Sequence, residues 1–497
     1  MTARHILALD QGTSSSRAIV FDERARPVAS AQHDVGARYP RPGWVEQDAH
    51  ALVETQLRAA REALAAAHLE PRDVAAIGVS NQRETIIAWE RDGSAAAPAI
   101  VWQDRRTSDR CAALRASGHE PAVRARTGLL LDPYFSGTKI GWLLDDLPDA
   151  RRRVAGGELL AGTVDSWLLW QLTGGLAYAT DVSNASRTLL MDLERRQWSA
   201  EMLELFDVPP DCLPEIRASD ADFGVTDAAH LGTEIPIRAM VGDQQAALFG
   251  QACFERGSAK NTYGTGCFLL MTTGSEPPRP PDHLLATVAW QRDTGPQVRY
   301  AVEGSVFVAG AAVRWLRDGL GIIGAADEIE ALAGSVPDSA GVVLVPAFSG
   351  LGAPYWEPDA RGTITGLTAG TSAAHIARAT LEAIGHQTVD LVEALESAGQ
   401  PALTTLRADG GAAVDDLLLQ VQADLLGRPV ERAAVAETTA LGAALLAGRS
   451  VGVWSSDEEV AGLVGRGRIF EPQRGEAWRL GMRQQWAEAV ARTRAPR

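Results

Sequence analysis

Residues 10–17 (DQGTSSSR) contain the residue types that bind a phosphate. A glycine flanked by short hydroxyl side chains separates two apolar runs, 6–9 and 18–21, which the pattern predicts as strands. A tight turn between them directs backbone N–H groups and hydroxyls outward together, which suits an anion. Asp10, at the end of the first strand, is placed to hold a cation near that phosphate, Mg²⁺ through water. An ordinary hairpin with a polar tip is the alternative.

Two later stretches contain related patterns. Residues 260–266 (KNTYGTG) predict a strand and turn before the apolar run 267–271, about 250 residues after the first hairpin. Asp409 is followed by Gly410 and Gly411, whose lack of a side chain allows a nucleoside to approach the backbone closely. Two phosphate hairpins and a glycine pair, in this order, are typical of the ATP sites of actin, Hsp70 and hexokinase.

Composition limits the class of protein. A chain of 497 residues is too long for one ordinary core, which favours two domains. The net charge of −16 argues against nucleic acid or an anionic membrane as partner. Lys139 and Lys260 are the only lysines, and neither lies in a GxxxxGK[ST] motif, which excludes a P-loop.

The sequence also favours a cytoplasmic location without membrane insertion. The four cysteines form no CxxC pair and no metal-like spacing, as expected of reduced residues. The first residues contain no signal-peptide apolar region, and no apolar run reaches membrane-spanning length.

Strands and helices alternate along the chain, which predicts two α/β domains facing a cleft. We expect them at residues 1–250 and 251–497, as duplicated versions of one unit. Among the predicted elements are strands at 74–80, 86–89, 99–102, 239–242 and 403–409, and helices at 48–68, 159–172, 245–251, 375–397, 415–426 and 438–447.

The sequence resembles the FGGY carbohydrate kinases over nearly its whole length, on residues 8–17, 42–46, 81–85, 132–139, 184–188, 242–250, 260–268 and 346–356. Residues 134–146 and 362–382 look like the two family signatures. The resemblance implies an α/β fold of two duplicated actin/Hsp70/hexokinase-like (ribonuclease H-like) domains around an ATP cleft. It also implies phosphorylation of glycerol to sn-glycerol 3-phosphate, the first step of glycerol catabolism, with ATP and Mg²⁺, by a homo-oligomer (dimer or tetramer).

The resemblance assigns Asp243 as the catalytic base. A polyol kinase needs a base for the attacking hydroxyl, and the transfer is otherwise mostly positioning and charge stabilisation. A helix N-cap before residues 244–251 is the structural alternative for Asp243. The residues implied to bind the acceptor are Arg83, Glu84, Trp102, Tyr134, Asp243, Gln244 and Phe268. From spacing alone, an exposed ion pair is favoured for Arg83 and Glu84, and core packing for Trp102 and Phe268.

On the nucleotide side the resemblance implies Thr13, Ser14, Ser15 and Arg17 at the first hairpin and Thr265 at the second. Gly310 and Gly411 would lie against ribose and adenine, with Asp415 near the adenine and Arg314 also on the nucleotide side. Arg314 stands where a glutamine is expected and Asp415 where an asparagine is expected, which leaves the nucleotide preference open.

Two other functions stay open. The first is an FGGY kinase for another polyol or ketose such as xylulose, although a longer sugar needs a roomier and more polar pocket. The second is an actin- or Hsp70-like ATP-driven binding module, in which Asp243 and the polyol residues would have no purpose.

Overall fold

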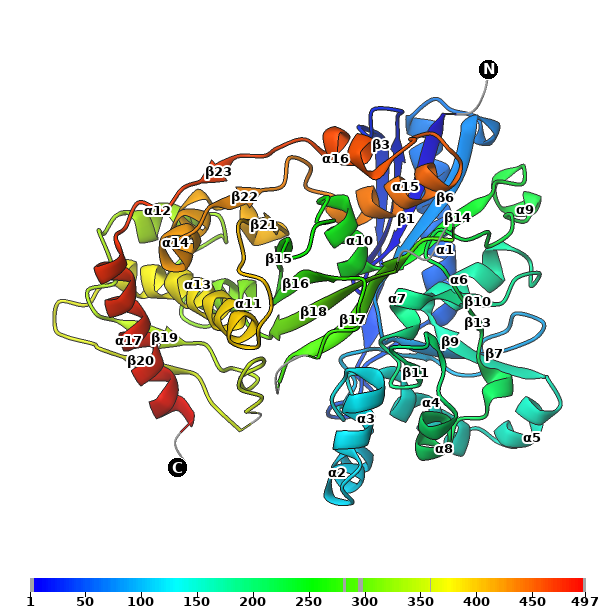
Figure 1. Ribbon diagram of the computed structural model, residues 1–497, viewed down its shortest axis with the longest axis horizontal. Coiled ribbons are helices and arrows are strands. Elements are labelled where there is room, and N and C mark those ends of the chain that lie inside the picture. The colour runs from blue at the N-terminus through cyan, green and yellow to red at the C-terminus, as the bar shows by residue number, and fades with distance from the viewer. Residues whose placement is uncertain (1–3, 280–282, 294–297, 358, 495–497) are drawn as a thin grey trace.

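The first of two central sheets lies in the N-terminal half of the chain. The structure is a computed structural model that describes residues 4–279, 283–293, 298–357 and 359–494. The sheet has the order β14-β6-β1-β2-β3 (Figure 1). Its strands are β1 (His5–Gln11), β2 (Ser15–Phe21), β3 (Pro27–Asp34), β6 (Val74–Asn81) and β14 (Ile237–Gly242). Strands β1, β2 and β3 are antiparallel, and β6 and β14 continue parallel to β1.

The sheet of the C-terminal half repeats this arrangement. Its order is β17-β18-β16-β15-β21-β22-β23, in which β15, β16 and β18 are antiparallel and β21 and β22 run parallel to β15. Its strands are β15 (Ala259–Tyr263), β16 (Cys267–Gly274), β17 (Leu285–Gln291), β18 (Val298–Val306), β21 (Leu406–Asp409), β22 (Val430–Arg432) and β23 (Ile469–Phe470). The predicted duplicated α/β fold is therefore confirmed.

Helices cover both sheets. Asp48 caps the first helix, which packs on β2 and β3 with its alanine and leucine face. The helices of the N-terminal half are α1 (Ala49–Ala66), α2 (Ser108–Ala116), α3 (Glu120–Thr127), α4 (Ser136–Asp146), α5 (Ala150–Ala155), α6 (Val164–Leu172), α7 (Val182–Ala185), α8 (Ala200–Phe206), α9 (Ala228–Leu231) and α10 (Asp243–Gly250). Those of the C-terminal half are α11 (Gly310–Asp318), α12 (Glu328–Gly334), α13 (Ala373–Ser397), α14 (Asp416–Leu426), α15 (Thr438–Ser450), α16 (Asp457–Val464) and α17 (Glu476–Arg494).

The two halves join where α10 crosses α15. A Cβ atom on Gly442 would lie 1.8 Å from the Ala246 carbonyl oxygen, and one on Gly250 would lie 2.1 Å from that of Thr438. Only glycine therefore permits this approach. Although α15 comes late in the chain, it packs on β6, β1 and β14 of the first sheet, beside the blue strands in Figure 1.

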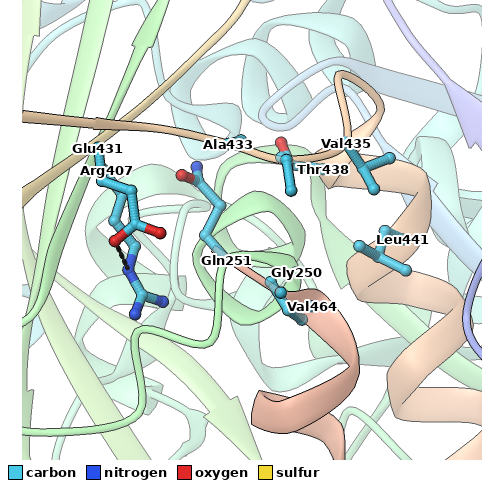
Figure 2. A pocket seen from close by; sticks show the side chains of 11 residues that line it. Gly250, Gln251, Arg407, Glu431, Ala433, Val435, Thr438, Leu441 and Val464 are labelled. Carbon is cyan, nitrogen blue, oxygen red and sulfur yellow. Dashed lines mark ion pairs between the residues drawn. The ribbon is translucent and has the colours of Figure 1, made fainter. Parts of the chain in front are cut away.

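A small hollow lies beside this joint rather than at the predicted site (Figure 2). Gln251, at the end of α10, and Leu441 of α15 line it together with Arg407 and Glu431, whose charged groups are 3.9 Å apart. The amide of Gln251 is buried there without a hydrogen-bond partner from the described residues. A bound water would satisfy such an amide.

A smaller sheet in the N-terminal half corrects one prediction. Residues 159–172 are not one buried helix, because strand β9 precedes α6. The run Leu-Leu-Ala-Gly is buried on both faces, so it lacks the alternation that distinguishes a strand from a buried helix. The predicted strand 99–102 is also shorter. The strands are β4 (Ala37–Arg38), β5 (Glu46–Gln47), β8 (Ala99–Ile100), β7 (Ile86–Glu90) and β9 (Leu159–Thr163).

Short strand pairs complete the fold: β10 (Ala179–Asp181) with β13 (Glu215–Arg217), β11 (Met191–Asp192) with β12 (Gln197–Trp198), and β19 (Val343–Val345) with β20 (Thr363–Thr365). Among the helices within the described ranges, none is long and apolar enough to cross a membrane.

Candidate active site

Arg83 and Glu84 follow β6 and are 3% and 1% exposed, so an exposed ion pair is excluded. Arg83 donates two hydrogen bonds to Glu303 of β18, at 2.6 and 3.1 Å, and a third to Gln245 at 3.2 Å. Its Nε lies 3.3 Å from Asp243 Oδ1. Three of the five N–H donors of the guanidinium are thus engaged, and of the remaining two the Nε donor is near the predicted base.

A second arginine, Arg187, closes a ring of alternating charges. It donates from Nε to Glu84 at 2.7 Å and from Nη2 to Glu303 at 3.0 Å. Burial raises the pKa of Glu84, against the opposing charges of Arg83 and Arg187. Although burial also opposes ionisation of Glu303, the same two guanidinium groups lower its pKa to about 2. Among the described residues, Glu84 Oε2 has no hydrogen-bond partner.

Glu303 and Arg187 were missed by the sequence analysis. One signal for Glu303 was present, because a lone carboxylate in an apolar strand (VRYAVEGSV) is unfavourable unless it is paired. Its partners lie 220 and 116 residues away, so the pairing itself could not be inferred.

Asp243 is the first residue of α10, directly after β14, and Gly242 is the N-cap. The side chain of Asp243 is 29% exposed, and its Oδ1 accepts a 2.7 Å hydrogen bond from the backbone N–H of Gln244. Desolvation raises the pKa of Asp243, against the opposing charges of Arg83 and Lys260. A carboxyl group with a raised pKa is a better proton acceptor than an ordinary aspartate.

Both lysines of the sequence are buried, and each donates a hydrogen bond to a predicted site residue. Lys260 donates to Gln244 Oε1 and, at 2.8 Å, to Thr262. An ammonium only donates, so Gln244 must direct its NH₂ group away from Lys260. Lys139 donates at 2.9 Å to the carbonyl oxygen of Tyr134, and burial lowers its pKa to about 7.

Aromatic side chains connect the polyol residues with the first hairpin. Trp102 and Tyr134 meet edge to face with ring centroids 5.6 Å apart. The indole N–H of Trp102 donates to Thr13 Oγ1 at 2.9 Å. Trp102 and Phe268 are each partly exposed, and Phe268 also packs against a hydrophobic core cluster, as the core-packing alternative for it predicts.

The first hairpin is the predicted turn between β1 and β2, closed by Gly12 N–H to the Ser15 carbonyl at 2.9 Å. Ser14 is exposed at its tip, whereas Arg17 pairs with Gln32 and with Glu437, before α15. Arg17 is thus already neutralised by a residue of the other half.

Asp10 stands where this hairpin approaches Asp243. Its Oδ1 accepts a 2.9 Å hydrogen bond from Ser80. Burial, with a smaller contribution from the charge of Asp243, raises the pKa of Asp10 to about 6, against Ser80 and Arg17. A carboxylate with so little compensation suits a hard cation.

The second hairpin is supported by the start of α11. Thr265 is exposed at its tip, and the backbone N–H of Ala309 and of Ala311 donate to its carbonyl at 2.9 and 3.1 Å. Arg314 donates to Thr265 Oγ1 at 3.2 Å, and Gly310 N–H donates to Gly264 at 3.0 Å. The structure thus brings Thr265, Gly310 and Arg314 together.

The glycine pair lies beside the same hairpin. A Cβ atom on Gly410 would lie 2.6 Å from the Tyr263 carbonyl oxygen, while one on Gly411 would meet nothing within 4 Å. Asp415 caps α14 through Oδ1, and its Oδ2 is buried without a hydrogen-bond partner from the described residues. Burial raises the pKa of Asp415 to about 6, with a smaller effect of Glu330.

Two hairpins, a carboxylate with a raised pKa and a buried polar fork are what a phosphotransferase site would need. Comparison with known proteins gives the family. Residues 5–250 match the N-terminal domain, and residues 259–451 the C-terminal domain, of the FGGY family of carbohydrate kinases. The chain therefore belongs to the FGGY family of carbohydrate kinases.

Within the family, the chain is similar to glycerol kinases and, at lower identity, to a xylulose kinase. The chain is 56% identical to a glycerol kinase of Acidovorax ebreus, over 99% of each chain. It matches the crystal structure of Plasmodium falciparum glycerol kinase with ADP at 35% identity, with a TM-score of 0.93 and 99% of each chain covered. A xylulose kinase of Rhodospirillum rubrum matches at 25% identity, with a TM-score of 0.86 over 98% of each chain.

Proposed function

We propose that this kinase transfers the γ-phosphoryl group of ATP to glycerol and forms sn-glycerol 3-phosphate. The observation that supports this most directly is the buried fork of Arg83 and Glu84 beside Asp243. Arg83 retains donors and Glu84 retains a free acceptor oxygen, which together suit adjacent hydroxyl groups. The full-length similarity to glycerol kinases at 53–56% identity supports the same acceptor.

In this proposal Asp243 takes the proton from the attacking hydroxyl group. Gln244 donates from its NH₂ group, Tyr134 contributes its hydroxyl, and Trp102 and Phe268 pack against the carbon chain. Water exclusion by these rings strengthens every polar contact with the substrate.

The nucleotide would lie between the hairpins. Thr13, Ser14, Ser15 and Arg17 contact its phosphates from one side, and Thr265 and Arg314 from the other. Gly310 and Gly411 leave room for ribose and adenine, and Asp415 Oδ2 would accept from the adenine amino group.

A magnesium ion would be held at Asp10, with the phosphates and water as its other ligands. In the part of the chain that the structure describes, no group of three or more His, Cys, Asp or Glu side chains could hold a metal ion. A site of one carboxylate plus phosphates is the usual way in which proteins bind Mg²⁺ with a nucleotide. The ion would neutralise charge that develops on the transferred phosphoryl group.

We further propose that the protein acts in the cytoplasm as a homo-oligomer, with its polyol site in a domain of residues 1–250 and its adenosine site in a domain of residues 251–497. Neither nucleic acid nor membrane insertion is needed for this function.

A coupled assay for ADP release with glycerol, with xylulose and with no acceptor tests the proposal. We expect release with glycerol only. A clear preference for xylulose would support the ketose kinase instead, and equal release without an acceptor would support an ATP-driven binding module.

A further inference from the structure

Glu303 is the one member of the charge ring that comes from the C-terminal half. It lies on β18, whereas its partners Arg83 and Arg187 belong to the N-terminal half. All four members of the ring, Glu84 included, are at most 3% exposed. The carboxylate accepts three hydrogen bonds of 2.6 to 3.1 Å from the two guanidinium groups.

Stability alone does not account for this ring. A buried ion pair gains little over a well-packed apolar pair, because both charges lose their hydration. What such a ring can provide is orientation, since a guanidinium that binds a carboxylate through two nitrogens has a fixed plane. The plane of Arg83 determines where its remaining donors point.

Competing acceptors make this orientation important. Arg83 Nε lies 3.3 Å from Asp243 and 3.8 Å from Glu84, so both carboxylates could accept from Arg83. A hydrogen bond from Arg83 to Asp243 would occupy the proposed base, and one to Glu84 would occupy the proposed hydroxyl acceptor. The two bonds to Glu303 oppose such a rotation of Arg83, because they hold both of its terminal nitrogens.

We propose that Glu303 is a positioning residue of the polyol site, which acts on glycerol through Arg83 and Arg187 without touching it. The C-terminal half thus completes an acceptor site whose proposed polar contacts belong to the N-terminal half. This inference rests on the proposed function, because it concerns the binding of glycerol.

The test compares Glu303→Gln with wild type in steady-state assays with glycerol and with ATP as the varied substrate. We expect the KM for glycerol to rise about 10- to 100-fold, the range for loss of a charged hydrogen bond, and the KM for ATP to change less than about threefold. Glu303→Asp retains the charge but is too short to bridge both arginines, so its KM for glycerol should be intermediate.

The second part is a double-mutant cycle. If part of the effect of Glu303 passes through Arg83, then Glu303→Gln should change the KM for glycerol less in an Arg83→Leu background than in wild type. Full additivity in this cycle would overturn the proposal, and so would an unchanged KM in the single variant.

A matched control separates positioning from general damage. Glu382 is also buried in the C-terminal half and pairs with an arginine, Arg378, at 2.9 Å, but outside the ring. Glu382→Gln should leave the KM for glycerol unchanged. An equal rise in that KM would refute a specific role of Glu303.

Wild-type activity distinguishes the two proposals. A wild-type enzyme that does not phosphorylate glycerol refutes the proposed function, and with it the role of Glu303 in glycerol binding. An active wild type with an unaffected Glu303→Gln variant refutes the role of Glu303 alone.

Discussion

Replacing Asp243 by asparagine should lower the activity of the enzyme without lowering its stability. The change removes the proposed base and retains the size of the side chain. Loss of a general base lowers kcat by roughly 10²- to 10⁴-fold, which corresponds to about 3–5 kcal/mol in the activation barrier. Affinity for ATP should change little, because the base acts on the acceptor hydroxyl.

The same substitution should not destabilise the fold. The raised pKa of Asp243 means that the folded protein disfavours the carboxylate relative to the unfolded chain. This destabilisation is absent below the unfolded pKa and fully present once the pH exceeds the folded pKa. At neutral pH the asparagine variant should therefore melt at the wild-type temperature or above it, and near pH 4 the two should agree.

The pH profile gives a further test of Asp243. In wild type, kcat should fall as the pH falls through the raised pKa of Asp243. Beside burial, the charged groups that set this pKa are Arg83 and Lys260, which lower it, and Glu303, which raises it. The asparagine variant should lose this dependence.

ADP release with saturating glycerol measures kcat, and nucleotide binding and thermal melting are measured on the same preparations. Asp222→Asn, an exposed carboxylate paired with Arg238, is the control and should leave kcat unchanged. An Asp243→Asn enzyme within about threefold of wild type would refute the role as base. A large fall in melting temperature would instead indicate a structural defect.

Three further substitutions test the remaining parts of the site. Arg83→Leu should raise the KM for glycerol more than it lowers kcat, because hydroxyl recognition is largely ground-state binding; loss of kcat at unchanged KM would contradict this. Arg314→Gln should raise the KM for ATP about two- to fivefold, less so at high salt, and an equal effect at all salt concentrations would exclude a charge effect. Asp415→Asn should raise the free energy of unfolding above pH 6, by up to about 3 kcal/mol for a pKa moved from 3.8 to about 6, and so raise the melting temperature there, with no effect near pH 4. Asp416→Asn should lower the melting temperature, because ion pairing lowers the pKa of Asp416. A lower melting temperature for both Asp415→Asn and Asp416→Asn would contradict the argument from burial of Asp415.

Local patterns were sufficient to predict the hairpins and the fold. The turn at Gly12 lies between two short apolar runs and the turn at Thr265 precedes another, and both strand pairs form as predicted. The duplicated strand order follows from the same repetition. The prediction of one helix at residues 159–172 was wrong because β9 is buried on both faces. Such a segment carries no periodicity that would distinguish it from the helix that follows.

Long-range pairing was not predictable in the same way. The short motif containing Arg83 and Glu84 suggested an exposed turn, and only the approach of β18 makes it a buried site. The role of α15 was likewise hidden, because its close contact with α10 depends on glycines at positions 250 and 442 that meet across nearly 200 residues.

The charges of the site favour a neutral acceptor over a sugar acid. The ring contains two cations and two anions, and Asp243 and Lys260 add one of each. Within the described ranges, Arg83 and Arg187 both already bind carboxylates of the protein, so a carboxylate on the substrate would have to displace Glu84 or Glu303 or remain buried without a cation. Either outcome costs several kcal/mol, whereas hydroxyl groups need only the donors and acceptors that remain. Gluconate should therefore neither serve as an acceptor nor compete with glycerol, and competitive inhibition by gluconate at millimolar concentration would show that the ring opens more readily than its geometry implies.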